Sequence, residues 1–182
     1  MFGVVEQPGD WRRGFWLINW ELHMSSFRSF TLAASVLLAA AVPASAPAQD
    51  FNATPNYGTI NLRTGFQPDP NVVRVQSGGN LDASRLDSTC AGFITSAPDV
   101  RLVYTAGDLP LIISVASRSD TTLVVIGPDG RWYCDDDGGV NGMNPQVRFN
   151  HPASGRYEIW VGTYGRAALR DARLNISEVS SQ

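Results

Sequence analysis

The chain has 182 residues, and its 14 basic residues, all of them arginines, face 17 acidic ones, which gives a formal net charge of −3. This balance argues against nucleic-acid binding, because proteins that bind the phosphate backbone carry a basic excess. The length allows one domain with a sizeable core but not two once a leader peptide is removed.

Residues 24–48 have the pattern of a secretory signal peptide. Arg28 supplies the charge of a short first region, an uncharged stretch covers residues 31–42, and residues 46–48 (Ala-Pro-Ala) provide small side chains before a cleavage site. The apolar run, at about 12 residues, is too short for a bilayer that needs roughly 20. A buried helix is the alternative. We expect an exported protein, periplasmic or extracellular, whose mature chain begins at Gln49 and has no membrane span.

Residues 1–23 fit no part of a signal peptide, since three tryptophans, a glutamate and a histidine interrupt any apolar run. A start codon assigned too early explains them best. The alternative is a twin-arginine export motif at residues 12–17, but Glu21 and His23 stand where its apolar region should continue. Either reading places the protein outside the cytoplasm. Removal of residues 1–48 leaves 134 residues, with 11 arginines against 14 acids.

Both cysteines, Cys90 and Cys134, lie in the part expected to be exported. An oxidising compartment favours closure of such a pair into a disulfide. Zinc binding is the weaker alternative, because the two cysteines lack ligand spacing and only His151 remains to help.

Residues 49–71 are rich in Asn, Pro, Gly and Thr, and we expect an extended N-terminal arm there. Residues 72–182 then alternate apolar and polar positions between turn signals, a pattern typical of an antiparallel β-sandwich. About eight strands are expected, and helix should be scarce, with at most a single turn within residues 84–89. The inward positions would be Val73, Val75, Leu102, Tyr104, Leu111, Ile113, Val115, Leu123, Val125, Val147, Phe149, Tyr157, Ile159, Val161, Leu174 and Ile176.

The sharpest turn signal is Pro128-Asp129-Gly130, in which Pro presets one backbone angle and Gly accepts a positive φ. It predicts a hairpin that joins residues 122–126 to residues 131–134.

Two motifs resemble the bacterial pre-peptidase C-terminal domain. Residues 120–137 (DTTLVVIGPDGRWYCDDD) have an aspartate before an alternating strand, a Pro-x-Gly hairpin and an aspartate cluster, and residues 154–162 (SGRYEIWVG) have the family's later Gly-x-Tyr-x-Ile-x-Val strand. The resemblance spans roughly residues 101–178. It implies a jelly-roll-like β-sandwich that serves secreted peptidases or other exported proteins as a non-catalytic accessory module, with calcium bound in some relatives. No peptidase domain accompanies the module here, so a peptidase activity does not transfer.

The acidic loop around residues 135–144 is the candidate metal site. Carboxylate and amide oxygens in a Gly-rich loop suit calcium, which takes six to eight oxygen ligands. The spacing is not that of an EF-hand, because Gln146 stands where the bidentate glutamate belongs. The alternative is a solvated turn whose side chains bind their own backbone amides. The candidate ligands are Asp120, Asp135, Asp136, Asp137, Asn141 and Asn144.

Catalysis is not expected. A Ser-His-Asp hydrolase would have to use His151, which has Ser154 only three residues away and no supporting nucleophile motif. We interpret His151 as an exposed loop residue.

Aromatic side chains suggest a ligand-binding face, and Trp160 is the best candidate. In the alternation of residues 156–162 it shares a face with Arg156 and Glu158, opposite the core face. The alternative is a tryptophan packed beneath a loop or against the disulfide.

The expected function is therefore that of an exported, non-catalytic binding or accessory module. Its partner would be a secreted peptidase, a cell-surface protein or a polysaccharide. The alternatives are a secreted serine-type peptidase and a structural subunit of an envelope assembly.

Overall fold

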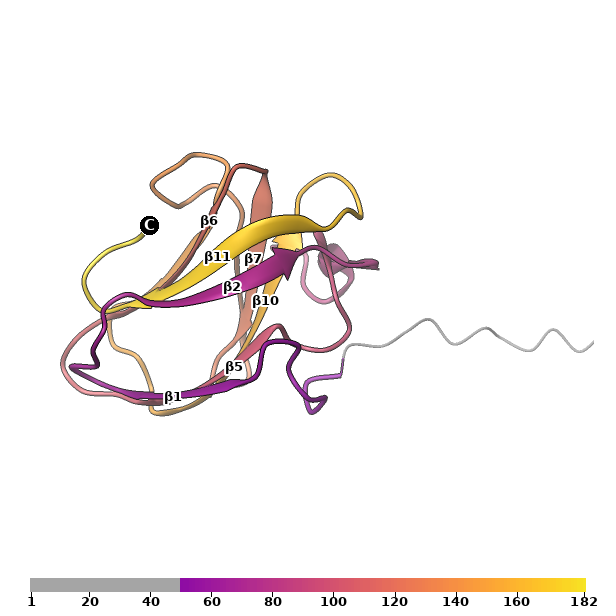
Figure 1. Cartoon of the computed structure of the whole chain (residues 1–182). Helices are drawn as coiled ribbons and strands as arrows, with labels where there is room; N and C mark the ends of the chain where they lie inside the picture. Colours follow the sequence, from indigo (N-terminus) through magenta and orange to yellow (C-terminus); the bar gives the residue numbers. More distant parts are fainter. Residues whose placement is uncertain (1–49) are drawn as a thin grey trace, which may run out of the picture. The chain divides into compact units, whose positions relative to one another are not determined.

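The computed structural model describes residues 50–182, which form an all-β sandwich of two sheets (Figure 1). The N-terminal extension of residues 1–23, the signal peptide of residues 24–48 and its cleavage point lie outside the described residues. Eight strands build the two faces of the sandwich: β2 (Asn71–Ser77), β5 (Val100–Thr105), β6 (Leu111–Ser117), β7 (Thr121–Ile126), β8 (Trp132–Asp135), β9 (Gln146–Phe149), β10 (Gly155–Thr163) and β11 (Arg170–Ser177).

These eight strands follow a jelly-roll order. The order in the first sheet, sheet A, is β5-β10-β7-β8, and that in the second, sheet B, is β2-β11-β6-β9. If these eight strands are renumbered 1 to 8 in chain order, sheet A has the order 2-7-4-5 and sheet B the order 1-8-3-6. This is the double Greek key of a jelly roll. Figure 1 shows β2 and β11 of sheet B above β5 of sheet A. The expected fold class is confirmed.

The core fills the space between the sheets and uses the alternate residues that the sequence pattern selected. Leu102, Tyr104, Ile113, Leu123 and Ile159 are all fully or almost fully buried in one cluster. The Pro-Asp-Gly turn joins β7 to β8 as expected: Gly130 has a φ of 74°, and the amide of Gly127 donates to the carbonyl of Arg131 at 3.0 Å.

Three short strands were not expected. β1 (Thr59–Arg63) pairs in parallel with β5, so the segment predicted as an extended arm contributes an edge strand to sheet A. β3 (Leu81–Asp82) and β4 (Phe93–Ile94) extend the same sheet beside β10. A 3₁₀ turn at Ala83–Arg85, capped by Asp82, is the helical element of the described residues.

A second apolar cluster covers the outer face of sheet A. It contains Trp160, Val124, Ile94 and the disulfide between Cys90 and Cys134, whose Cα atoms lie 5.0 Å apart. The predicted disulfide is thus confirmed. Among residues 50–182, no helix is long and apolar enough to span a bilayer.

Candidate functional site

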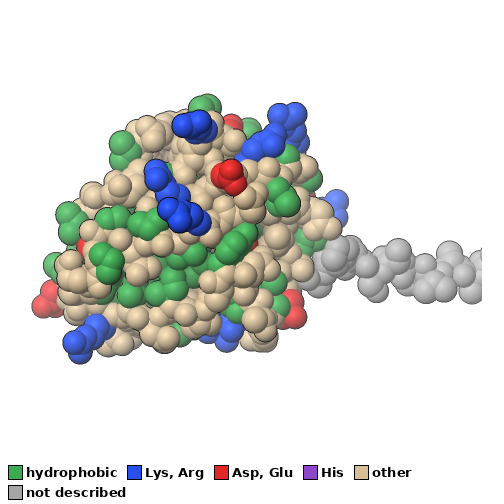
Figure 2. Space-filling view, in the orientation of Figure 1, with side chains coloured by type: hydrophobic (Ala, Val, Ile, Leu, Met, Phe, Trp, Pro, Cys, Tyr) green, Lys and Arg blue, Asp and Glu red, His purple; other side chains and the backbone are tan. Residues whose placement is uncertain are grey.

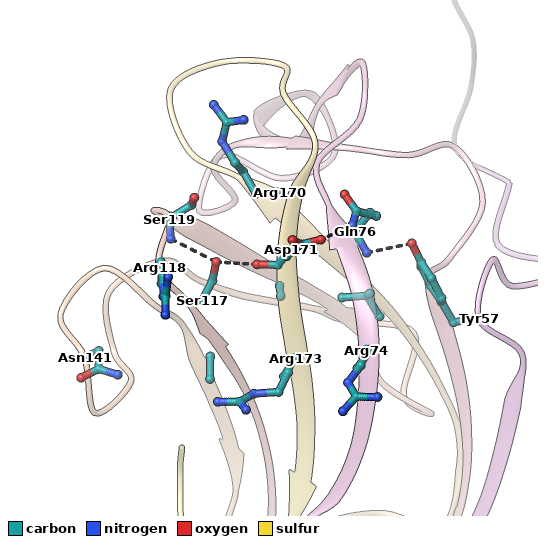
Figure 3. A pocket seen from close by; sticks show the side chains of 13 residues that line it. Tyr57, Arg74, Gln76, Ser117, Arg118, Ser119, Asn141, Arg170, Asp171 and Arg173 are labelled. Atoms are coloured by element: carbon teal, nitrogen blue, oxygen red, sulfur yellow. Dashed lines mark hydrogen bonds between the residues drawn. The ribbon is translucent and has the colours of Figure 1, made fainter.

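A groove of about 880 Å³ lies on the outer face of sheet B, away from the core. Figure 3 shows that its side chains come from β2, β6 and β11 and from the loops beside them. The polar residues that line the groove are Tyr57, Arg74, Gln76, Ser117, Arg118, Ser119, Asn141, Arg170, Asp171 and Arg173, and the apolar ones are Val75, Ala116 and Ala172.

Strand alternation places the arginines on this face. On β2, Val75 points into the core, so its neighbour Arg74 points outward. On β11, Ala172 points into the core, so its neighbour Arg173 points outward. The pairing register sets Arg74 directly opposite Arg173, with Ala116 of β6 on the other side of Arg173. The small side chain of Ala116 leaves the space into which the guanidinium groups can reach.

Hydrogen bonds fix the polar upper part of the groove (Figure 3). The side chain of Gln76 donates to the carboxylate of Asp171, and its backbone amide donates to the hydroxyl of Tyr57 at 2.7 Å. The hydroxyl of Ser117 donates to the carbonyl of Asp171 at 2.8 Å, and accepts from the amide of Ser119 at 3.1 Å. The edge of the groove is therefore ordered before any ligand arrives.

The charge of the groove is strongly positive. Arg74, Arg118, Arg170 and Arg173 line the groove together with the single carboxylate of Asp171, which already accepts from Gln76. The ion pairs of residues 50–182 lie elsewhere and involve Arg101, Arg131 and Arg156, so none of the groove arginines has an acidic partner within 4.0 Å. Figure 2 shows arginine side chains on this face, above a band of hydrophobic ones. A concentrated positive field attracts anions.

The acidic loop is only partly the site that the sequence suggested. The Oδ2 of Asp135 accepts from the backbone amides of Gly138 and Gln146, each at 2.8 Å, so this carboxylate orders the loop. Asn144 is buried, accepts from the hydroxyl of Thr121 at 2.8 Å and donates to the carbonyl of Ser117. Asp135 thus binds backbone amides, which is the role that the alternative gave it, whereas Asn144 is buried and binds a hydroxyl and a backbone carbonyl.

The other predicted metal ligands divide into two groups. Asn141 is exposed and lines the arginine groove. Asp120, Asp136 and Asp137 lie near one another: desolvation raises the pKa of Asp120, and repulsion from Asp137 and then Asp136 raises it further. In the described part of the chain, no three acidic, His or Cys side chains are grouped closely enough to hold a metal ion.

The prediction that Trp160 lies on an exposed ligand-binding face is wrong. The alternation does point it away from the main core, but the ring is 0% exposed because Phe51 and Trp132 lie over it, with ring centroids 6.4 and 6.0 Å away. Trp160 packs with the disulfide, as the alternative reading proposed. Partly exposed Trp132, on the neighbouring hairpin, is the tryptophan that a ligand can reach.

His151 is exposed, and no hydrogen bond or ion pair within residues 50–182 involves its imidazole. The hydroxyl of Ser154 accepts from the amide of Ala106 at 2.9 Å. A nucleophilic triad requires a serine bonded to a histidine that a third group orients. The described residues do not make these contacts around His151.

No protein-family model matches the chain, and no curated protein matches it. Among solved structures, the crystal structure of PliG from Aeromonas hydrophila, a periplasmic lysozyme inhibitor of g-type lysozyme, is similar to this chain. The two share 15% identity over 65% of this chain and 96% of that one, with a TM-score of 0.36. Identity and TM-score at this level carry no inference about a partner or an activity.

Sequence reasoning missed the arginine groove. The signal was present, since Arg74 and Arg173 occupy the polar positions of two alternating strands. What the sequence did not contain was the pairing of β2 with β11, which are almost 100 residues apart and lie side by side only in the folded sandwich.

Proposed function

We propose that this chain is a non-catalytic binding module whose arginine groove docks an acidic segment of a protein partner. The observation that carries the proposal is the set of four groove arginines without acidic partners in the described residues. Arginine presents a planar fork of donors that matches the two oxygens of a carboxylate.

The composition of the groove favours a protein over a purely ionic ligand. Arginine and tyrosine are the residue types that contribute most binding energy at protein interfaces. Tyr57, 38% exposed, stands at one side of the groove, and Ala116 adds a small apolar side chain between the charges. A segment that carries carboxylates beside small apolar side chains would complement both features.

The disulfide supports action outside the cytoplasm, because such bonds persist in oxidising compartments. An exported protein is the natural partner, and the resemblance to peptidase-associated modules makes a secreted peptidase one candidate. An envelope protein with an acidic surface segment is another.

The test uses a fluorescein-labelled Glu-Ala-Glu-Glu-Ala-Glu peptide, with fluorescence anisotropy measured at several salt concentrations. We expect saturable binding that weakens as salt rises, since exposed charges are screened beyond about 10 Å at 0.1 M. Arg74→Gln with Arg173→Gln should weaken binding about tenfold or more. Arg148→Gln is the matched control, because Arg148 is an exposed arginine of β9 that does not line the groove.

Equal affinity of the groove variant and the Arg148 variant would overturn the proposal. So would tighter binding of a polygalacturonate oligomer than of the peptide, since that result would make an acidic polysaccharide the ligand. Each variant is first checked for a melting temperature no lower than that of the wild type, so that a loss of binding reports on the groove alone.

A further inference from the structure

A second pocket, of about 600 Å³, lies on the outer face of sheet A, the side of the sandwich opposite the arginine groove. Phe51 and Trp132 form an aromatic wall, with ring centroids 5.6 Å apart. Pro128, in the turn between β7 and β8, and Gly155, at the start of β10, also line the pocket. Arg156 and Glu158 of β10 supply the polar groups.

Glu158 is a buried carboxylate with one oxygen left unpaired. Its side chain is 3% exposed, and its Oε1 accepts from the Nε of Arg101 at 2.6 Å and lies 2.9 Å from the Nε of Arg156. Its Oε2 is buried and has no hydrogen-bond partner. Buried acceptors in proteins nearly always have a donor, and Glu158 lines the pocket, so its unpaired oxygen indicates a donor supplied by a ligand.

The same two arginines hold the aromatic wall in place. Arg101 donates to the backbone carbonyls of Phe51 and Ala53 at 3.0 and 3.1 Å, and Arg156 donates to the side chain of Asn52 at 3.1 Å. Trp160, buried beneath Phe51 and Trp132, supports both rings from below. The pocket is therefore assembled without a ligand, with its aromatic wall fixed relative to Glu158.

The charges around Glu158 limit the chemistry of the ligand. Two guanidinium groups face one carboxylate, so the net positive charge would repel a cation. The unpaired oxygen of Glu158 would repel an anion. A neutral group with several hydroxyls satisfies both, because a hydroxyl donates to Glu158 and accepts from Arg156. The C–H face of a pyranose ring, in addition, packs on an aromatic ring at low entropic cost.

We propose that this pocket binds one neutral hexopyranose ring of an oligosaccharide, stacked on Trp132 and bonded through a hydroxyl to Glu158. The proposal rests on sheet A alone and is independent of the arginine groove. It gives the module a saccharide site on one face and a protein-docking groove on the other. The aromatic contact predicted for Trp160 thus passes to Trp132, its neighbour on the surface.

The experiment is saturation-transfer NMR and isothermal titration calorimetry of the full chain with cellotetraose, maltotetraose, mannotetraose and chitotetraose. We expect at least one of these neutral tetraoses to bind. Trp132→Ala should lower its affinity about tenfold or more, and Glu158→Gln should do the same, because an NH2 donor then replaces one of the two acceptor oxygens. Phe51→Ala, on a partly exposed ring, is the variant least able to disturb the fold.

Tyr164→Ala is the matched control, since Tyr164 is a 48% exposed aromatic residue that does not line the pocket. It should bind the same tetraose as the wild type does. Melting temperatures identify any variant that fails to fold, in which case the Phe51 variant decides. Absence of binding for all four tetraoses at 10 mM would overturn the proposal, as would affinity that survives in both the Phe51 and the Glu158 variants.

Discussion

Asp99 accepts the backbone amide of Val161 on its Oδ2 at 2.8 Å, so a side chain just before β5 takes the place of a strand partner for β10. Its Oδ1 accepts from the side-chain amide of Asn56 at 3.0 Å. Asp99 is 1% exposed, and its burial raises its pKa to about 6. The two hydrogen bonds lower the pKa but do not offset the effect of burial.

This raised pKa predicts a pH-dependent stability. Between about pH 4 and pH 6 the folded chain holds a proton on Asp99 that the unfolded chain has released, so the free energy of unfolding falls as pH rises. The contribution of Asp99 to this fall is about 3 kcal/mol, and it levels off above pH 6. Urea unfolding from pH 4 to pH 7 measures it. Asp99→Asn should flatten this part of the profile, and an unchanged slope would show that another group titrates.

The disulfide should contribute strongly to stability, because it joins two cysteines that are 44 positions apart in the sequence and packs against Trp160. Cys134→Ser should lower the free energy of unfolding by about 2–5 kcal/mol. Urea unfolding of the wild type in the presence of a reductant should give the same loss. Native protein that titrates with two free thiols would contradict the prediction.

Arg74→Gln should stabilise the fold while it weakens acidic-peptide binding. Arg74 and Arg173 are directly opposite across β2 and β11, and like charges at such positions are destabilising by about 0.2–1 kcal/mol. Urea unfolding at low salt should show the gain, and 0.5 M salt should reduce it. A loss of stability would mean that these arginines serve the fold and not a ligand.

Substitutions in the acidic loop should separate its structural role from calcium binding. Asp135→Ala should lower the melting temperature equally with calcium and with chelator, because Asp135 binds two backbone amides. Calcium binding itself stays a prediction for this loop, where a divalent ion would relieve the repulsion that raises the pKa of Asp120. No three acidic, His or Cys side chains of the described residues are already grouped closely enough to hold the ion. We expect millimolar calcium to raise the melting temperature by several degrees, and Asp136→Asn with Asp137→Asn to abolish the rise. Identical melting curves in calcium and chelator would remove calcium from the account.

The sequence was sufficient for the sandwich because each long strand has one apolar face. Val75, Leu123, Ile159 and Leu174 illustrate this: each alternates with more polar neighbours or lies in a short apolar run between turn signals, and each is buried in the core. The short strands were missed for two reasons. β3 and β4 have two residues each, which is too few for a pattern. β1 does alternate, with Ile60 and Leu62 packed against the core, but it lies in a stretch rich in Asn, Pro, Gly and Thr.

The two candidate sites depend on pairings across long sequence distances, which explains why the sequence did not reveal them. The alternation placed Trp160 on the correct face of β10, but it contained no information on Phe51, about 110 residues earlier, which covers that face. The same limit applies to Glu158, whose partner Arg101 comes from β5. Single-strand patterns predict which side chains share a face, whereas the contents of a pocket follow from the fold.

The central place of β11 in sheet B sets the order in which the molecule can assemble. β11 pairs with β2 on one side and β6 on the other, so these two strands have open edges until residues 170–177 arrive. The sandwich cannot close before its last strand is available, and non-local pairings of this kind are slow to form. Exposed strand edges are sites of aggregation. Truncation before residue 170 should therefore yield aggregates instead of a smaller domain.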